Sequence, residues 1–209
     1  MAADHSLNKE YLPISGDAEF VRLSQGLMLG AECERVSNGS VAGVQALSGT
    51  GSLRVLFNFI KNTIAADNGS FKVFLSNPTW GNHKKVIAKS GLNYELHTYW
   101  DPKGRCLDLK GMLSDLKEKS SPGDVVLLHG CAHNPTGVDP TKEQWAQIAD
   151  TVHALKLVPF FDCAYQGFAT GDVDADAVEF IFIQSIYPHE YRASESVFKS
   201  LMSTHSLNC

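Results

Sequence analysis

The chain has 209 residues, of which 44% are hydrophobic and 20% are charged, and its formal net charge is -5. This length and apolar content are typical of one folded domain with its own core. The mild negative charge argues against a nucleic-acid surface, and the apolar runs are far shorter than the roughly 20 residues needed to span a bilayer. Composition therefore predicts one soluble domain that binds neither nucleic acid nor membrane.

The N-terminal residues and the cysteines indicate a compartment. The opening stretch MAADHSLNKEYLP has no apolar segment of the kind that a secretory signal peptide carries. The five cysteines are an odd number without tight spacing: Cys33, Cys106, Cys131, Cys163 and Cys209. This usage is typical of reduced thiols rather than of a disulfide framework. We therefore expect a reducing, cytoplasm-like compartment.

Helical and strand-like patterns alternate along the first half of the chain. Apolar residues at helical spacing, or short apolar runs bounded by turn residues, distinguish the two. The predicted helices span residues 19–29, 53–64 and 84–90, and the predicted strands span residues 41–47, 71–75 and 94–99. Gly91 is the expected end of the third helix.

The same alternation continues in the second half. A helix is predicted over 109–119 and strands over 125–128 and 157–161. Between those strands, Thr141 followed by Gln144 forms a capping-box pattern that opens another helix. Such alternation predicts an α/β fold with a mostly parallel sheet between two layers of helices. After Val178 no clear pattern follows, so we expect an incomplete sheet edge.

Polar residues follow two of the predicted strands. Asn134 comes after the first, and Asp162 and Tyr165 come after the second. Ligands of open α/β sheets bind beyond the carboxyl ends of the strands. A carboxylate at this position is expected to be partly buried and to need a partner. The simpler alternative is that Asp162 only caps a helix or forms a turn.

Ser48-Gly49-Thr50-Gly51 lies between a predicted strand and a predicted helix. Free backbone N–H groups and the helix dipole make such a junction suitable for an anion, and glycine lets a phosphate approach. The turn matches neither the dinucleotide pattern G-x-G-x-x-G nor the P-loop. Many such turns use glycine for geometry alone, so both interpretations stay open.

His129, Cys131 and His133 have the alternating spacing of a small metal cluster. No C-x-x-C or H-x-x-x-H pair completes a tetrahedral set. A strand that ends in a loop at Asn134 explains the three residues more simply. A metal- or nucleotide-binding α/β module is nevertheless a third possible function, after an enzyme and a binding fragment.

The polar residues indicate one ligand when they are taken together. A carboxylate at Asp162 could hold a protonated ring nitrogen, and Tyr165 with Asn134 could bond a phenolic oxygen. The indole of Trp80 could stack on a flat ring, and the Ser48 turn could bind a phosphate. Ring nitrogen, phenolic oxygen, flat face and phosphate together describe pyridoxal 5'-phosphate.

Five ordered segments carry a family resemblance: NKEYLPI, SGTGSLRV, NPTWGNH, LLHGCAHNPTGVDP and FFDCAYQGFATGD. With them the chain closely resembles the aspartate aminotransferases, which are class I, fold-type I pyridoxal-phosphate enzymes; aromatic-amino-acid aminotransferases share much of the set. The resemblance implies a homodimer with a three-layer α/β large domain. It covers about half of a typical member, with residues 1–178 as a partial large domain and residues 179–209 as a divergent tail.

The resemblance implies roles around the cofactor ring. Trp80 looks like the residue that stacks on the ring and lines the substrate site. Asn134 and Tyr165 look like the pair that bonds the phenolic oxygen, with Asn134 also touching substrate. Asp162 looks like the partner of the ring nitrogen, and His83 looks like its support.

It also implies roles around the phosphate. Ser48, Gly49 and Thr50 look like its cradle, and Ser196 matches a serine that binds it. Tyr11 looks like the tyrosine that reaches the phosphate of the neighbouring subunit.

The family needs a lysine that forms the Schiff base and shuttles a proton. The run Ser196-Val197-Phe198-Lys199-Ser200 lies at nearly the expected distance from Asp162, but the G-L-Y of the family motif does not follow. The phosphate-binding arginine expected after the lysine is also missing, since no arginine follows Arg192. Lys199 is therefore either the Schiff-base lysine or an exposed lysine in a divergent tail.

Two functions follow from the resemblance. One is pyridoxal-phosphate-dependent transfer of an amino group between L-aspartate and 2-oxoglutarate. The other is a catalytically inactive fragment that binds pyridoxal phosphate or pairs with full-length subunits. We expect no metal in either case.

Overall fold

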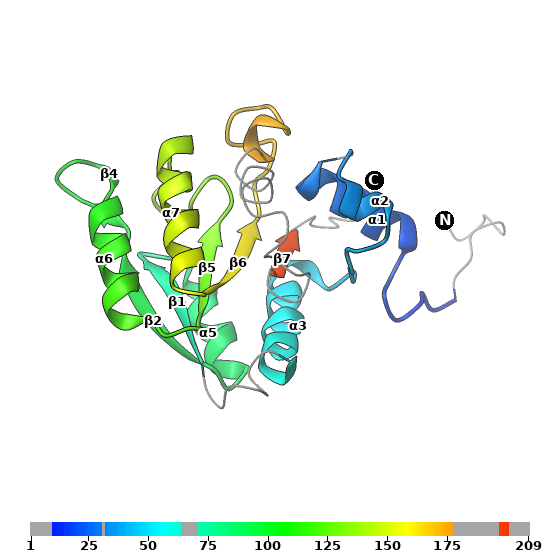
Figure 1. Ribbon diagram of the computed structural model, residues 1–209. Coiled ribbons are helices and arrows are strands. Elements are labelled where there is room, and N and C mark those ends of the chain that lie inside the picture. Colours follow the sequence, from blue (N-terminus) through cyan, green and yellow to red (C-terminus); the bar gives the residue numbers. More distant parts are fainter. Residues whose placement is uncertain (1–9, 31, 64–70, 178–196, 201–209) are drawn as a thin grey trace.

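The computed structural model describes residues 10–30, 32–63, 71–177 and 197–200 (Figure 1). The α-helices are α1 (Ala18–Leu29), α2 (Glu34–Ser37), α3 (Ser48–Thr63), α5 (Gly81–Lys89), α6 (Leu109–Lys119) and α7 (Lys142–Ala154). The strands are β1 (Lys72–Asn77), β2 (Asn93–Thr98), β3 (Trp100–Asp101), β4 (Cys106–Leu107), β5 (Val125–His129), β6 (Val158–Cys163) and β7 (Val197–Ser200). A short 3-10 helix, η1, covers Ala175–Ala177.

Five strands form one parallel sheet in the order β2-β1-β5-β6-β7. The strands β3 and β4 form a separate antiparallel hairpin, which the sequence patterns did not predict. In the large sheet, His129 at the end of β5 is in register with Asp162 on β6. The carboxyl ends of these two strands therefore meet at one edge, as the α/β prediction requires.

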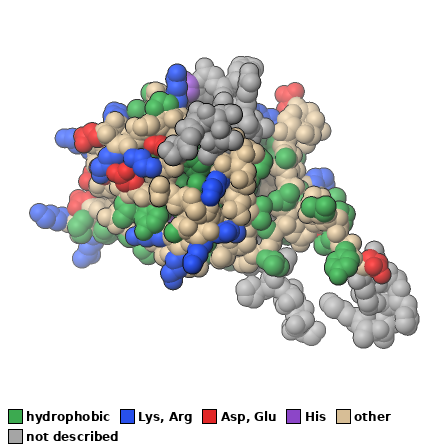
Figure 2. All heavy atoms as spheres, turned by 90° about the horizontal axis from the view of Figure 1, so that it is seen from below, with side chains coloured by type: hydrophobic (Ala, Val, Ile, Leu, Met, Phe, Trp, Pro, Cys, Tyr) green, Lys and Arg blue, Asp and Glu red, His purple; other side chains and the backbone are tan. Residues whose placement is uncertain are grey.

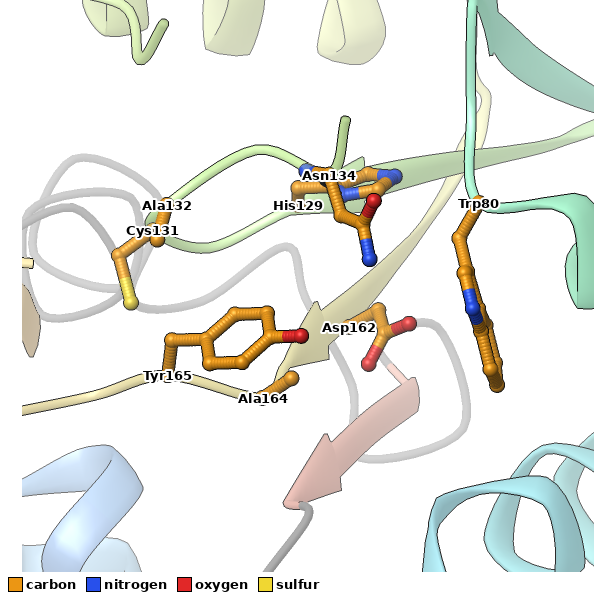
Figure 3. Close-up of a pocket in the computed structure, with 8 residues that line it drawn as sticks. All are labelled: Trp80, His129, Cys131, Ala132, Asn134, Asp162, Ala164 and Tyr165. Carbon is orange, nitrogen blue, oxygen red and sulfur yellow. Dashed lines mark hydrogen bonds between the residues drawn. The ribbon is translucent and has the colours of Figure 1, made fainter. Parts of the chain in front are cut away.

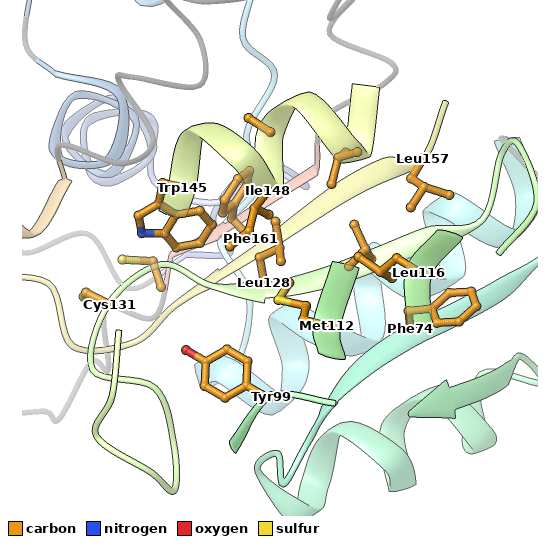
Figure 4. Close-up of a cluster of buried hydrophobic side chains, with 14 of the residues drawn as sticks. Phe74, Tyr99, Met112, Leu116, Leu128, Cys131, Trp145, Ile148, Leu157 and Phe161 are labelled. Carbon is orange, nitrogen blue, oxygen red and sulfur yellow. The ribbon is translucent and has the colours of Figure 1, made fainter. Parts of the chain in front are cut away.

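The two faces of the sheet pack against different helices. Alternate residues of each strand point to opposite faces, so Phe74 and Phe161 belong to one buried cluster and Leu75 and Phe160 to the other. The first cluster contains residues of α6 and α7 (Figure 4). The second contains residues of α3 and α5. The molecule therefore has three layers, which confirms the predicted fold class.

Strand β6 is packed on both faces, and all six of its residues are buried. On one face the ring of Phe160 stacks on Phe57 of α3, with centroids 4.8 Å apart. On the other face Phe161 packs against Trp145 of α7 at 6.2 Å. Full burial of one such side chain contributes about 1.5–3 kcal/mol. These contacts fix the strand that carries Asp162 near its carboxyl end.

Most predicted elements are confirmed within a few residues, including the helix over 109–119 and the capping box of α7. Thr141 accepts a hydrogen bond from the backbone of Gln144, and the side chain of Gln144 accepts one from the backbone of Thr141. This reciprocal pair satisfies two N–H groups that have no partner within a helix.

The predicted strand over 41–47 is wrong, because these residues lie outside the sheet. The segment bonds instead to N-terminal residues: Gln25 of α1 donates to the carbonyl of Val41 at 2.9 Å, and Gln45 donates to the carbonyl of Ser15 at 2.9 Å. Val41 packs partly against the core cluster, whereas Leu47 is 90% exposed. The short apolar run therefore reflects contact with the N-terminal segment rather than strand pairing.

Charged side chains do not gather into one patch on the face that Figure 2 shows, where Lys and Arg are interspersed with Asp and Glu. Within the described ranges, no helix is long and apolar enough to cross a bilayer.

Candidate active site

A pocket of about 110 Å³ lies at the carboxyl ends of β1, β5 and β6 (Figure 3). It is lined by residues from the loops after these strands and from the strand ends themselves: Trp80, His129, Cys131, Ala132, Asn134, Asp162, Ala164 and Tyr165. Four residues that the sequence singled out, Trp80, Asn134, Asp162 and Tyr165, are thereby brought together. They come from three separate parts of the chain because adjacent parallel strands end side by side.

Asp162 forms a buried hydrogen bond with a histidine. The side chain of His83, which is fully buried on α5, lies 2.7 Å from the carboxylate, between Nε2 and Oδ2. Asp162 itself is only 6% exposed. Removing a carboxylate from water is costly unless a partner compensates it. His83 supplies that partner and fixes the direction of the carboxylate.

Thr79 extends this contact to a second imidazole. Its hydroxyl lies 2.8 Å from Nδ1 of His83 and 3.3 Å from Nε2 of His129. The backbone N–H of Asn134 donates to Nδ1 of His129 at 3.3 Å. With both imidazoles neutral, Nε2 of His129 then donates to Thr79, and Thr79 donates to His83. The remaining proton of His83, on Nε2, faces Asp162, so this chain of bonds orients a donor toward the carboxylate.

The other pocket residues surround Asp162. Figure 3 shows the hydroxyl of Tyr165 and the side-chain amide of Asn134 directed toward the space beside the carboxylate, with the indole of Trp80 on the opposite side. The indole also packs edge-on against His83, with centroids 5.4 Å apart. The pocket therefore offers one anionic group, one phenol, one amide and one flat aromatic face.

A stack of aromatic rings lies behind the pocket. The ring of His133 lies 3.9 Å from Tyr99 and 4.2 Å from His129, measured between centroids. The hydroxyl of Ser76 lies 2.8 Å from Nε2 of His133, and that of Thr136 lies 2.8 Å from Nδ1. Burial lowers the pKa of His133 to about 4, so the ring is neutral near pH 7.

The predicted alternative of a metal cluster at His129, Cys131 and His133 gains no support. Both ring nitrogens of His133 have hydroxyl partners, as described above. In the described part of the chain, no group of three or more His, Cys, Asp or Glu residues has an arrangement suited to a metal ion.

Two buried thiols lie beside the pocket. Cys131 and Cys163 are 6% and 4% exposed, and both are free cysteines. A hydrogen bond with Cys163 and burial raise the pKa of Cys131 far above its ordinary value. Cys131 is therefore a neutral thiol in the pocket wall. Sequence reasoning singled out this residue only as a metal ligand.

The predicted phosphate residues lie elsewhere. Ser48, Gly49 and Thr50 form the first turn of α3 and are not among the residues that line the pocket. Ser48 has a left-handed backbone with φ 56°, and its side chain and that of Thr50 are exposed. Tyr11 is fully exposed on the N-terminal segment.

Of the two tail residues of the predicted site, the structure describes only one. Ser196 lies outside the described residues. Lys199 is on β7, where its backbone is in register with Asp162 on the neighbouring strand.

Sequence reasoning missed Thr79 and the role of His129 as its partner. A partial signal existed for Thr79, because it lies just before Trp80, the N-cap of the helix α5 that carries His83. The contact of Thr79 with His129 depends on the meeting of the loop after β1 with the end of β5, which no local pattern records.

Comparison with known proteins gives consistent results. The sequence profile of the family described as Aminotransferase class I and II matches residues 2–199. The cytoplasmic isozyme 2 of aspartate aminotransferase from Arabidopsis thaliana is 50% identical over 173 residues, which are 83% of this chain and 42% of that protein. Other matched aspartate aminotransferases are named chloroplastic, in Arabidopsis thaliana, and mitochondrial, in Xenopus tropicalis.

Solved structures agree with the sequence matches. Cytoplasmic aspartate aminotransferase from Saccharomyces cerevisiae superimposes with a TM-score of 0.81 at 36% identity, covering 89% of this chain and 44% of that one. An aromatic-amino-acid aminotransferase from Burkholderia pseudomallei, covalently bound to pyridoxal phosphate, gives a TM-score of 0.79 at 38% identity and covers 86% and 44%. The chain thus spans less than half the length of these proteins. It belongs to the class I and II aminotransferase family.

Proposed function

We propose that this chain is part of a pyridoxal-phosphate-dependent aspartate aminotransferase, which transfers an amino group between L-aspartate and 2-oxoglutarate. The observation that carries the proposal is the convergence of Trp80, Asn134 and Tyr165 around the buried carboxylate of Asp162. The aspartate aminotransferases among the matched relatives support the choice of substrates.

The residues present fit pyridoxal phosphate, the cofactor of this family. A buried carboxylate held by His83 suits a protonated ring nitrogen, and the indole of Trp80 suits a flat ring. The phenol of Tyr165 and the amide of Asn134 are donors suited to a phenolic oxygen. When bound, the cofactor supplies an electron sink for the substrate carbon that loses its proton.

The chain's own residues have the following proposed tasks. Asp162 keeps a proton on the ring nitrogen, because a close negative charge favours the protonated form. His83 donates from Nε2 and holds the carboxylate in that position. Trp80 limits the space above the ring, and Asn134 also contacts the substrate.

We propose a phosphate site at the start of α3. The first N–H groups of a helix have no partner within the helix and carry the positive end of its dipole. Ser48, Gly49 and Thr50 supply three such groups and two hydroxyls. Ser196 and, from a neighbouring subunit, Tyr11 are proposed as further phosphate ligands.

Lys199 is the proposed attachment point of the cofactor, and its Nζ is the proposed proton carrier. The support is its backbone register beside Asp162. A lysine amine is suited to both roles once its pKa is lowered.

Cofactor capture is the decisive test. We expect the purified chain to develop an imine absorption band on titration with pyridoxal phosphate. Borohydride reduction should then fix the adduct on the peptide that contains Lys199, as read by mass spectrometry. Lys199→Ala is the control and should bind without a reducible adduct. An adduct on other lysines only would contradict the proposed role of Lys199.

A second candidate function is an inactive fragment that binds the cofactor or pairs with full-length subunits. The observation in its favour is that the chain spans only 42% of a relative such as the Arabidopsis thaliana isozyme. Transamination between aspartate and 2-oxoglutarate well above the rate of free pyridoxal phosphate would reject it. Sedimentation of the chain alone, and mixed with a full-length relative, separates homodimer from mixed dimer.

We also propose that the protein is cytoplasmic, that residues 1–178 form a partial large domain and that residues 179–209 form a tail. The cysteines that the structure describes are free, as a reducing compartment requires. Fluorescence microscopy of the tagged protein tests the compartment. Limited proteolysis tests the boundary, with first cleavage expected beyond residue 178.

A further inference from the structure

The loop that follows β6 is closed by one buried carboxylate. Asp176 lies on η1 and is 3% exposed. Its Oδ2 accepts from the backbone N–H groups of Gly167 at 2.7 Å and Ala169 at 3.0 Å. Its Oδ1 accepts from the backbone of Thr170 at 3.1 Å and from the hydroxyl of Thr170 at 2.7 Å. Four donors from three residues of the loop, Gly167, Ala169 and Thr170, therefore converge on one side chain.

These contacts favour the ionised form of Asp176. Burial alone would raise its pKa, but the hydrogen bonds from Thr170, Ala169 and Gly167 outweigh burial and lower the pKa. Each oxygen receives two donors, so the acceptor capacity of the carboxylate is well used. Hydrogen bonds to a charged group are stronger than those between neutral groups, so the ionised Asp176 is a strong hydrogen-bond acceptor for this loop.

The same loop begins with the pocket residue Tyr165. The N–H of Phe168 donates to the carbonyl of Tyr165 at 2.9 Å and makes a turn. Gly167 has φ 87° in this turn, and a side chain there would meet Val173 at 3.1 Å. Gln166 donates to the carbonyls of Val173 and, at 2.6 Å, of Leu27 on α1. The turn is therefore held from both sides.

The phenol of Tyr165 depends on this backbone. The residue is 44% exposed, and its hydroxyl has no hydrogen bond to another residue in the described part of the chain. Its direction toward the pocket in Figure 3 thus follows from the turn that carries it rather than from contacts of its own.

We propose that Asp176 is a positioning residue, whose carboxylate closes the loop over 166–176 and thereby places the phenol of Tyr165 at the pocket. The proposal rests on the proposed function in so far as Tyr165 contacts the cofactor. It also makes a claim about the free protein, namely that the position of Tyr165 depends on Asp176.

The test compares Asp176→Asn with Asp174→Asn. An amide offers one accepting oxygen, so two of the four donors lose their acceptor and face an NH₂ group. Asp174 is exposed on the same loop and serves as the matched control. Thr170→Val removes one of the four donors to Asp176, together with the longer contacts of that hydroxyl with Asp172, and is a milder variant should Asp176→Asn fail to fold.

The first measurements need no cofactor. We expect Asp176→Asn to speed amide exchange of residues 167–170 and to raise the rate at which tetranitromethane nitrates Tyr165 severalfold, as followed by peptide mass spectrometry. Thr170→Val should show the same changes to a smaller extent, and Asp174→Asn should show neither. Unchanged nitration in both Asp176→Asn and Thr170→Val overturns the proposal, whether or not pyridoxal phosphate binds.

The last measurement separates positioning from general loosening. Affinity for pyridoxal phosphate is titrated in the wild type, Asp176→Asn, Tyr165→Phe and the double variant. If Asp176 acts through Tyr165, its substitution weakens binding roughly tenfold in the wild type and far less in the Tyr165→Phe background, since residues of one network are not additive. Equal losses in both backgrounds overturn the proposal. A wild type that captures no cofactor contradicts the proposed function alone.

Discussion

Asp162 and Ser48 are expected to hold opposite ends of one ligand, yet the fold positions them by different means. Asp162 lies near the end of a strand with buried neighbours on both faces, and its carboxylate is bonded to a buried histidine. Ser48 begins a helix after a segment that pairs with no strand, and its side chain is exposed.

The difference shows what a parallel sheet contributes to a site. Neighbouring strands bring Asn134 and Asp162 together whatever their separation in sequence, because the register of the sheet is fixed by its buried faces. The turn at Ser48 has no such constraint. Its position relative to the sheet is set by the helix α3, whose buried face packs against the sheet.

A fall in pH should give the largest effect, a loss of folding stability that arises at two buried histidines on or beside the sheet. Burial lowers the pKa of both His97 and His133 from 6.5 to about 4, so the unfolded chain binds more protons than the folded chain between these values. Stability is therefore complete above pH 6.5 and is lost as the pH falls toward 4. One pKa unit corresponds to about 1.4 kcal/mol, so protonation of the two imidazoles together should lower the free energy of unfolding by several kcal/mol.

Urea unfolding at pH 7 and at pH 4.5 measures this loss. His97→Gln and His133→Gln should flatten the pH dependence, even though each lowers stability at pH 7. An unfolding midpoint that is the same at both pH values would contradict the lowered pKa values of these two imidazoles.

Asp162→Ala should have the next largest effect and is compared with Ser48→Ala. Loss of a charge-assisted hydrogen bond costs roughly 1.5–3 kcal/mol, which is about 10- to 150-fold in affinity for pyridoxal phosphate. The phosphate contacts are shared among several donors, so Ser48→Ala should lose less. Absorbance titration gives both affinities. Equal values for the two variants would show that Asp162 contributes no more to cofactor affinity than Ser48.

Thr141→Ala should cost about 1 kcal/mol of unfolding free energy, as N-cap substitutions usually do. Thr141 opens α7, whose buried face packs against the sheet beside Phe161. Thr141→Ser keeps the capping oxygen and serves as the control. Chemical unfolding followed by circular dichroism measures both, and a loss shared by the serine variant would point away from capping.

Asp17→Ala should have the smallest effect. Asp17 caps α1 by accepting from Phe20 at 2.8 Å, but only Met28 and Leu29 of that helix are buried. We expect a global loss below that of Thr141→Ala, with faster amide exchange confined to the first turn of α1. A loss as large as that of Thr141→Ala would show that the N-terminal segment is as strongly coupled to the core as α7.

Sequence patterns identified the sheet and the strand-end residues of the site. Alternation of strands and helices predicts parallel pairing, and parallel pairing brings strand ends together, so Asn134, Asp162 and Tyr165 were predictable as neighbours. The burial of Asp162 required a partner, but its identity as His83 came from the family resemblance and not from spacing.

Other features depend on contacts that sequence spacing does not contain. The short apolar run over 41–47 looked like a strand because contact with the core and α1 also calls for apolar residues. Thr79, in the loop after β1, contacts His129 at the end of β5, and Asp176 closes a loop with donors up to nine residues away. In each case the path of a loop determines which residue becomes the partner, and a loop lacks the regular residue spacing of a helix or strand.

The ring stack behind the pocket makes the site observable by magnetic resonance. The imidazole of His133 is sandwiched between Tyr99 and His129, so ring currents should shield its protons and shift their signals upfield. Occupancy of the pocket that moves His129 by a fraction of an ångström would alter these shifts. The protein therefore contains its own reporter, which could follow ligand entry without any added label.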